Sequence, residues 1–164
     1  MFNFTVDTAH TFYVGMDGWL VHNGTPCFPL GFKSQGQYQQ FSGQLYAGLS
    51  RAGFKGSEVF FQGSAVTGRS FETGAAFDLG RTSDFDIALV NSNMLEKLSQ
   101  AGYRVKANGS AVGPLTPEQI EYLGLGVVQR SLSTQAGREV NFMVYGSSDA
   151  ARLKTSMRML NPKP

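Results

Sequence analysis

Two aspartates separated by one residue, Asp84 and Asp86, carry the strongest chemical signal in the sequence. They open the run DFDIALV (84–90), whose apolar end is typical of a strand buried on both faces. Side chains two apart on a strand project from one face, so both carboxylates would lie together. Like charges that close repel unless a cation lies between them, and Mg²⁺ or Mn²⁺ binds carboxylate oxygens together with substrate phosphates. The pair therefore predicts a divalent-metal site.

Small residues stand where a phosphate would be held. Gly63 and Ser64 follow directly on the run EVFFQ (58–62), and Ser83 directly precedes the aspartates. A strand that ends in a glycine turn can bring backbone N–H groups against a phosphate. The intervening stretch supplies further polar side chains, which we expect to form part of a substrate pocket: Thr67, Arg69, Ser70, Arg81 and Thr82.

The elements that position these residues follow from periodicity. Apolar residues recur at spacings of three and four over 35–52, which predicts a helix ending at Gly53. Thr116-Pro117-Glu118-Gln119 is typical of a helix start, with threonine as the cap. Further strands are predicted at 58–62, 84–90 and 139–145, and further helices at 93–100 and 148–160. This order predicts an α/β (α+β) domain with a small mixed sheet and flanking helices.

The first 36 residues have a different character. Short β-rich runs at 2–6, 12–14 and 19–21, with Asp17-Gly18 between the last two, predict a small β appendage. Residues 24–36 contain two prolines and three glycines, as a linker would. We therefore divide the chain into an appendage (1–23), a linker (24–36) and a main domain (37–164).

Composition narrows the class of protein. With 164 residues, 41% of them hydrophobic, the chain can form one domain with a substantial core. A net charge of +2 is too small to establish nucleic-acid binding by itself, although Arg104, Lys106, Arg130, Arg138, Arg152, Lys154 and Arg158 would suit an RNA cradle. The single cysteine excludes an internal disulfide framework and a multi-cysteine zinc site. No apolar run approaches the ~20 residues of a membrane span, so we expect no membrane insertion.

The order of a strand, Gly63-Ser64, a loop, Ser83-Asp84-Phe85-Asp86 and an apolar run resembles the signature of the nucleotidyltransferase fold, the polymerase-β-like superfamily. The resemblance implies that Gly63 and Ser64 contact the triphosphate of an NTP, and that Asp84 and Asp86 bind Mg²⁺. It makes the nearby polar side chains further nucleotide-binding candidates: Thr67, Arg69 and Ser83.

That family takes a third carboxylate from a later strand. The matching hydrophobic triplet here is Val140-Asn141-Phe142, which carries an amide in place of the acid. Glu139 lies two residues from Asn141, on the same strand face, and can supply a carboxylate instead. Glu139 and Asn141 are therefore both candidate catalytic residues, and the general base stays open.

The first segment carries a second resemblance. FTVDTAHTFYVG followed by WLVHN resembles the last conserved blocks of a Hint (hedgehog/intein) self-processing module, in which a terminal His-Asn pair cleaves the chain. The matching residues are His22 and Asn23, with His10 in the preceding block. Residue 24 is glycine, not the Cys, Ser or Thr that splicing needs, so the resemblance implies cleavage. A Hint tail before a small domain resembles the C-terminal effectors of Rhs-type polymorphic toxins. This implies an upstream Rhs delivery protein, action in the target-cell cytoplasm and a cognate immunity protein.

Three functions fit these features. The first is a toxin that transfers a nucleotide or phosphoryl group from an NTP to an RNA such as tRNA, to another nucleotide or to a protein hydroxyl. The second is a metal-dependent RNase that uses the same aspartates and needs no NTP. The third is a non-catalytic binding module whose acidic pair recognises only a partner.

Overall fold

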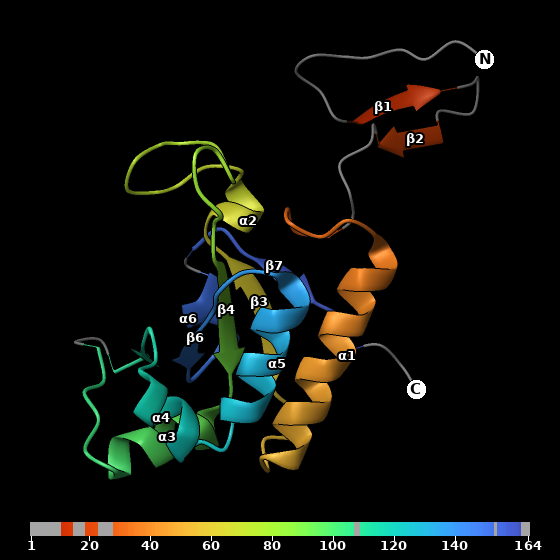
Figure 1. The fold of residues 1–164 in the computed structure, drawn as a ribbon. Coiled ribbons are helices and arrows are strands. Elements are labelled where there is room, and N and C mark those ends of the chain that lie inside the picture. Colours follow the sequence, from red (N-terminus) through yellow and green to blue (C-terminus); the bar gives the residue numbers. More distant parts are fainter. Residues whose placement is uncertain (1–10, 15–18, 23–27, 107–108, 153, 162–164) are drawn as a thin grey trace.

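The structure is a computed structural model that describes residues 11–14, 19–22, 28–106, 109–152 and 154–161 (Figure 1). A hairpin of β1 (Thr11–Val14) and β2 (Trp19–His22) comes first. The main domain has the elements α1 (Gln35–Arg51), β3 (Glu58–Gln62), α2 (Ser64–Thr67), β4 (Phe85–Val90), α3 (Ser92–Gln100), β5 (Ala111–Val112), α4 (Pro117–Tyr122), α5 (Gly126–Ala136), β6 (Val140–Tyr145), α6 (Ser148–Arg152) and β7 (Met157–Met159).

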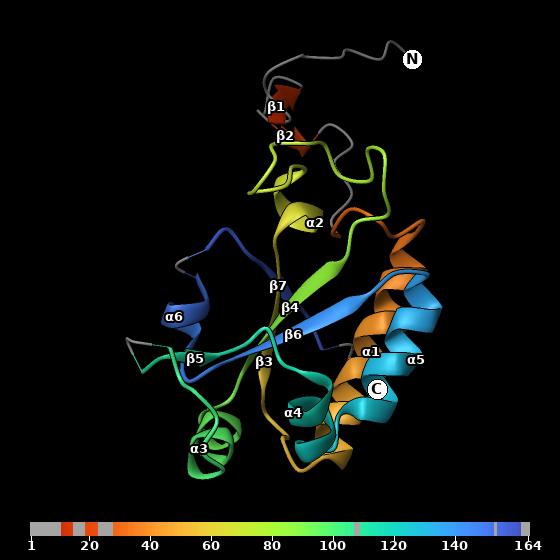
Figure 2. The ribbon, with the colours of Figure 1, turned by 60° about the vertical axis from the view of Figure 1, so that its left-hand side comes forward.

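One mixed sheet organises the main domain. Its strand order is β5-β6-β4-β3-β7, and β4 runs parallel to β6 while the other neighbouring pairs are antiparallel. Helices α1 and α5 lie together on one side of the sheet and the short α6 lies on the other (Figure 2). The predicted α+β class, with a mixed sheet and flanking helices, is confirmed.

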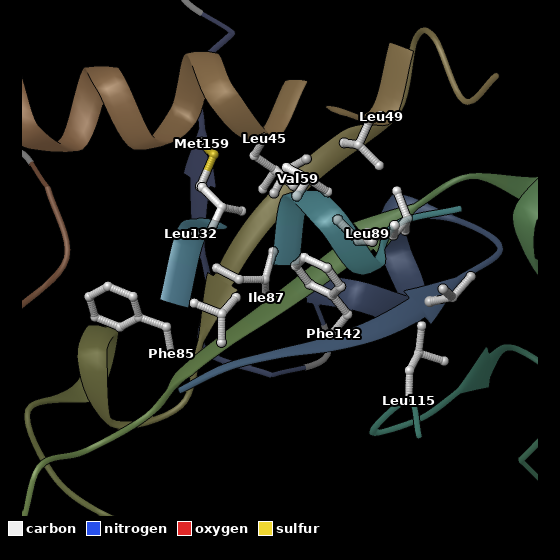
Figure 3. Close-up of a cluster of buried hydrophobic side chains, with 14 of the residues drawn as sticks. Leu45, Leu49, Val59, Phe85, Ile87, Leu89, Leu115, Leu132, Phe142 and Met159 are labelled. Atoms are coloured by element: carbon white, nitrogen blue, oxygen red, sulfur yellow. The ribbon is translucent and has the colours of Figure 1, made fainter. Parts of the chain in front are cut away.

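The side of the sheet that faces α1 and α5 holds the larger core. In β4 the alternate residues Phe85, Ile87 and Leu89 are all buried there, packed with Leu45 and Leu49 of α1 (Figure 3). Rings of four further aromatic residues surround Phe61, at centroid distances of 5.3 to 6.2 Å. Because side chains alternate along a strand, Asp86, Ala88 and Val90 project to the opposite side.

The C-terminal segment differs from the prediction. Residues 148–160 do not form one helix: α6 ends at Arg152, and Met157–Met159 forms the edge strand β7 against β3. The strand has the tertiary contacts that a helix would lose. Met159 is buried in the core, and its carbonyl oxygen accepts a hydrogen bond from Tyr46 Oη at 2.9 Å. Pairing also covers the edge of β3, whose backbone groups would otherwise need water.

Several helices and strands lie where the sequence predicts them, and the structure contains others that the sequence does not predict. Helix α1, strand β3, helix α3 and the hairpin β1–β2 match their predicted ranges to within two residues. Thr116 and Gln119 form the predicted capping box of α4. Helix α5 and strand β5 were not predicted. The predicted strand at 2–6 and the turn at Asp17-Gly18 lie outside the described residues.

Part of the predicted linker belongs to the core. Phe32 is buried, and its ring stacks on that of Phe85 at a centroid distance of 4.9 Å. The N–H of Leu30 donates to the carbonyl oxygen of Ala65 in α2 at 2.8 Å. The packed chain thus begins before residue 37. None of the helices in the described part of the chain has the length and apolar character needed to cross a bilayer.

Candidate functional site

Polar side chains from three neighbouring strands come together on the α6 side of the sheet. The register places Gln62 of β3 opposite Asp86 of β4, and Asp86 opposite Asn141 of β6. Asp84 directly precedes β4, and Asn141 Nδ2 donates a hydrogen bond to Asp84 Oδ2 at 2.7 Å. The antiparallel β3–β4 pair and the parallel β4–β6 pair therefore bring the aspartates and the predicted third position to one place.

The Gly63 backbone lies directly against the Asp86 carboxylate. A Cβ atom at Gly63 would stand 2.3 Å from Asp86 Oδ2, closer than any side chain tolerates. Gly63 also has φ +68°, a left-handed conformation that residues with a Cβ rarely adopt. The backbone conformation favours glycine here, and any side chain would displace the Asp86 carboxylate. Ser64 follows as the first residue of α2, so the Gly-Ser turn lies beside Asp86.

The electrostatics of the pair match two carboxylates held close together. Asp86 is half-buried, and burial raises its pKa; the charge of Asp84 raises it further, while Lys154 opposes both effects. In the protein alone the charged form of Asp86 is thus disfavoured. A cation near the pair would reverse that balance, because an adjacent positive charge favours the ionised carboxylate.

The third position holds an amide and not a free acid. The side-chain N–H of Asn141 is used by Asp84, which leaves its carbonyl oxygen as a ligand. Glu139 is exposed just before β6, and its backbone oxygen accepts from the N–H of Phe85 at 2.8 Å. Among the described residues, no three Asp, Glu, His or Cys side chains are grouped as a metal cluster. Two carboxylates fit Mg²⁺, which takes one or two of them together with phosphate oxygens.

The other predicted nucleotide-binding side chains make local hydrogen bonds. The Thr67 hydroxyl donates to the carbonyl oxygen of Arg69 at 2.8 Å, and Arg69 Nη1 donates to that of Gly74 at 3.2 Å. Ser83 is buried, and its hydroxyl accepts from the N–H of Asp78 at 3.0 Å. Thr67 and Arg69 are exposed beside the Gly-Ser turn, whereas Ser83 holds the loop that leads into Asp84.

Arg138 was placed among the residues of an RNA cradle, and the structure corrects this. Its side chain is 9% exposed and donates to both carboxylate oxygens of Asp78, at 3.0 and 3.1 Å, and to the backbone oxygen of Ser83 at 2.7 Å. The guanidinium also lies 5.0 and 4.9 Å from the ring centroids of Phe77 and Phe85. Arg138 therefore fastens the 68–83 loop, which joins α2 to β4, onto the sheet. No sequence motif marks this role.

Gln62 is a second site residue that the sequence analysis missed. It is 3% exposed, and Gln62 Nε2 donates to the carbonyl oxygen of Ala151 in α6 at 2.7 Å. Tyr145 Oη donates to Gln62 Oε1 at 3.3 Å, and burial raises the pKa of Tyr145. This buried amide joins α6 to the strand beside Asp86. In the sequence it is only the last residue of a strand.

The residues of the predicted processing remnant lie mostly outside the described part of the chain. His22 ends strand β2, whereas Asn23 and His10 lie outside the described residues. Comparison of the chain with known protein families, with curated proteins and with solved structures finds no match. The functional interpretation therefore rests on the geometry of the site and on the sequence resemblances.

Proposed function

We propose that this chain is a Mg²⁺-dependent nucleotidyltransferase that transfers a nucleotide or phosphoryl group from an NTP to an acceptor hydroxyl. One observation carries the proposal: the Gly63 backbone lies against the carboxylate of Asp86, while Asp84 pairs with Asn141 on the next strand. This supports the proposal because it joins a glycine turn to a pair of carboxylates that can share a divalent cation. The same combination defines the nucleotidyltransferase signature that the sequence resembles.

The proposed roles follow from the positions of the residues. Asp84 and Asp86 hold Mg²⁺, which when bound offsets the negative charge of the phosphates. On this proposal the backbone N–H groups of the Gly63-Ser64 turn contact the triphosphate beside the acids. The acceptor oxygen forms a bond to the α-phosphorus, the bond to the β-phosphate oxygen breaks, and pyrophosphate leaves with that electron pair. The hydroxyl proton passes to the Glu139 carboxylate or to solvent water, because the Asn141 amide cannot accept it.

The biological setting is proposed from the sequence alone. Residues 11–14 and 19–22 form the hairpin that belongs to the Hint-like tail. On this proposal the domain is a toxin released from an upstream Rhs delivery protein, it acts in the target-cell cytoplasm, and an immunity protein neutralises it in the producer. Expression in a bacterial cytoplasm should then stop growth, and Asp84→Ala/Asp86→Ala should restore it.

The central experiment is incubation of the purified chain with cell extract, Mg²⁺ and each NTP labelled with ³²P at either the α-phosphate, which follows nucleotide transfer, or the γ-phosphate, which follows phosphoryl transfer. We expect label in one class of acceptor, namely RNA, protein or a small nucleotide. Asp84→Ala/Asp86→Ala should abolish the label and still fold. The matched control is Asp149→Asn, an exposed acid of α6, which should transfer normally.

The same tubes test the rival function. If no NTP gives label but RNA is shortened in an Asp84-dependent manner, the site is that of a metal-dependent nuclease and the transferase proposal fails. If neither reaction occurs, and the double variant changes only the binding of a partner protein, the acidic pair is a recognition surface.

A further inference from the structure

The 68–83 loop presents an aromatic ring to solvent. Phe71 is fully exposed, and Leu79 in the same loop is 69% exposed. Phe77, the other aromatic residue of the loop, packs against the core. Its ring and that of Phe85 in β4 lie on the guanidinium of Arg138. The end of the loop near Phe77 is therefore packed onto the domain, whereas the end that carries Phe71 projects into solvent.

This exposed end belongs to an ordered loop. The N–H of Ser70 donates to the carbonyl oxygen of Ala75 at 2.8 Å, and the N–H of Gly74 donates to that of Ser70 at 2.9 Å. Arg69 and Ala76 form an isolated β-bridge. Arg138 holds the C-terminal half of the loop through its two hydrogen bonds to Asp78. A loop whose backbone is already ordered can present Phe71 to a flat ligand without the cost of ordering the loop.

The loop starts and ends at the candidate site. It leaves α2, which begins with Ser64, and it leads directly into Asp84. Figure 1 shows it projecting past α2 at the end of the sheet where β4 begins. Arg69 and Arg81, one on each side of Phe71 in the loop, are both exposed.

We infer that the 68–83 loop binds an unpaired base of an RNA acceptor by stacking it on Phe71, with Arg69 and Arg81 near its phosphates. This inference rests on the proposed function, because it names the acceptor class of that site. Base–aromatic stacking tolerates any base, and arginines beside the ring suit a phosphodiester chain. A strand bound in this way would lie along the loop that leads into Asp84.

A protein acceptor fits these residues less well. Protein interfaces depend on clustered apolar anchors in a buried centre. The exposed residues around Phe71 are mainly small or polar: Glu72, Thr73, Gly74, Ala76, Gly80 and Thr82. Phe71 and Leu79 are the two large apolar side chains that the loop exposes, too few for such a centre, and the flat ring of Phe71 suits the face of a base.

The test measures RNA binding without NTP. A fluorescein-labelled, unstructured RNA of about 12 nucleotides, a length typical of single-strand sites, is titrated with the full chain and followed by anisotropy. We expect Phe71→Ala to weaken the Kd by about 5- to 100-fold, the effect of losing one base–aromatic stack, and Phe71→Trp to restore it. Val127→Ala removes a comparably exposed apolar side chain from α5 and should bind like the wild type.

Binding and transfer are read out separately. Asp84→Asn/Asp86→Asn should keep the RNA affinity while losing any label transfer, so a failure of the proposed chemistry is visible without affecting the binding result. Equal affinity of wild type and Phe71→Ala overturns the inference. So does an absence of RNA binding combined with Phe71-dependent labelling of a protein, which would make the acceptor a protein.

Discussion

The two faces of the sheet differ in what they can tolerate. Towards α1 and α5, strand β4 presents Phe85, Ile87 and Leu89, each at most 1% exposed. Towards α6, the same strand presents Asp86, Ala88 and Val90, and the neighbouring strands add the buried amide of Gln62 and the half-buried Asn141. On the first face apolar side chains are fully buried, which favours folding. On the second face the charged side chain of Asp86 is only half-buried, because burying a charge costs free energy.

This difference shows how one small sheet can hold two carboxylates close together although their repulsion lowers the stability of the fold. Apolar burial on the α1–α5 face supplies stability of a size that scales with the area removed from water. Over the α6 face the described residues place a helix of five residues, and Asp84 and Asp86 there stay partly exposed to solvent. We expect substitutions on the first face to alter folding, and those on the second to alter chemistry.

The largest effect is expected from Phe61→Ala. This ring is fully buried against four other aromatic rings, so its removal should lower the free energy of unfolding by about 3–5 kcal/mol. Urea denaturation measures it. Phe71→Ala is the matched control, because that fully exposed ring should change stability by no more than about 0.5 kcal/mol. Similar losses for both would contradict the assignment of the core.

The second largest effect is expected from Gly63→Ala, at the turn directly after β3. The added Cβ collides with Asp86 Oδ2, and the alanine must keep the backbone φ of +68°. We therefore expect the free energy of unfolding to fall by about 2 kcal/mol and label transfer to be lost. Gly53→Ala has a similar positive φ, +88°, with nothing within 4 Å of the new Cβ. It should show only the conformational cost, about 1 kcal/mol, with transfer intact. Normal transfer by Gly63→Ala would remove the glycine turn from the site.

A smaller effect is expected at the loop anchor. The hydrogen bond from Arg138 holds the pKa of Asp78 below its ordinary value of 3.8. The folded state thus binds this proton less readily than the unfolded state, so the pair stabilises the fold above about pH 4 and the contribution is lost as the pH falls. A double-mutant cycle of Asp78→Ala and Arg138→Ala should give a coupling of about 1 kcal/mol at pH 7, since Asp78 is partly exposed.

The pH dependence of that coupling is the contradicting measurement. We expect the coupling to fall as the pH is lowered, whereas a coupling near zero already at pH 7 would show that Arg138 acts by packing on Phe77 and Phe85 alone. In that case Arg138→Met, which keeps a long apolar chain, should be as stable as the wild type.

The smallest effect on stability is expected from Asp86→Asn. Burial and the charge of Asp84 raise the pKa of Asp86, so the folded state binds this proton more readily than the unfolded state does. Stability is then lost as the pH rises through the folded pKa, and the neutral amide avoids that loss. Without metal, the variant should equal the wild type or exceed it by up to about 1 kcal/mol at pH 7.

Added Mg²⁺ distinguishes the two proteins further. It should raise the melting temperature of the wild type, because a ligand that binds only the folded state stabilises it, and leave Asp86→Asn unchanged. A destabilisation of Asp86→Asn by more than about 3 kcal/mol would instead assign Asp86 a structural role.

Much of the site was predictable because it depends on local order. The glycine turn after β3 and the aspartates at the start of β4 are read from spacing within the chain. Their proximity needs only that β3 and β4 pair, which their apolar runs favour. Arg138 and Gln62 were not predictable in this way, since their partners Asp78 and Ala151 lie 60 and 89 residues away.

The amino-acid sequence by itself determined the helices with clear periodicity, the strands with apolar runs and the alternation that puts both aspartates on one face. These features follow from backbone geometry and the spacing of apolar side chains. Only the tertiary structure decided that residues 157–159 pair with β3 in place of continuing a helix, and that Phe32 enters the core. It also decided that Asn141 faces Asp84. The physical reason is that burial and strand pairing depend on partners distant in the chain, and these outweigh local propensities of a few tenths of a kcal/mol.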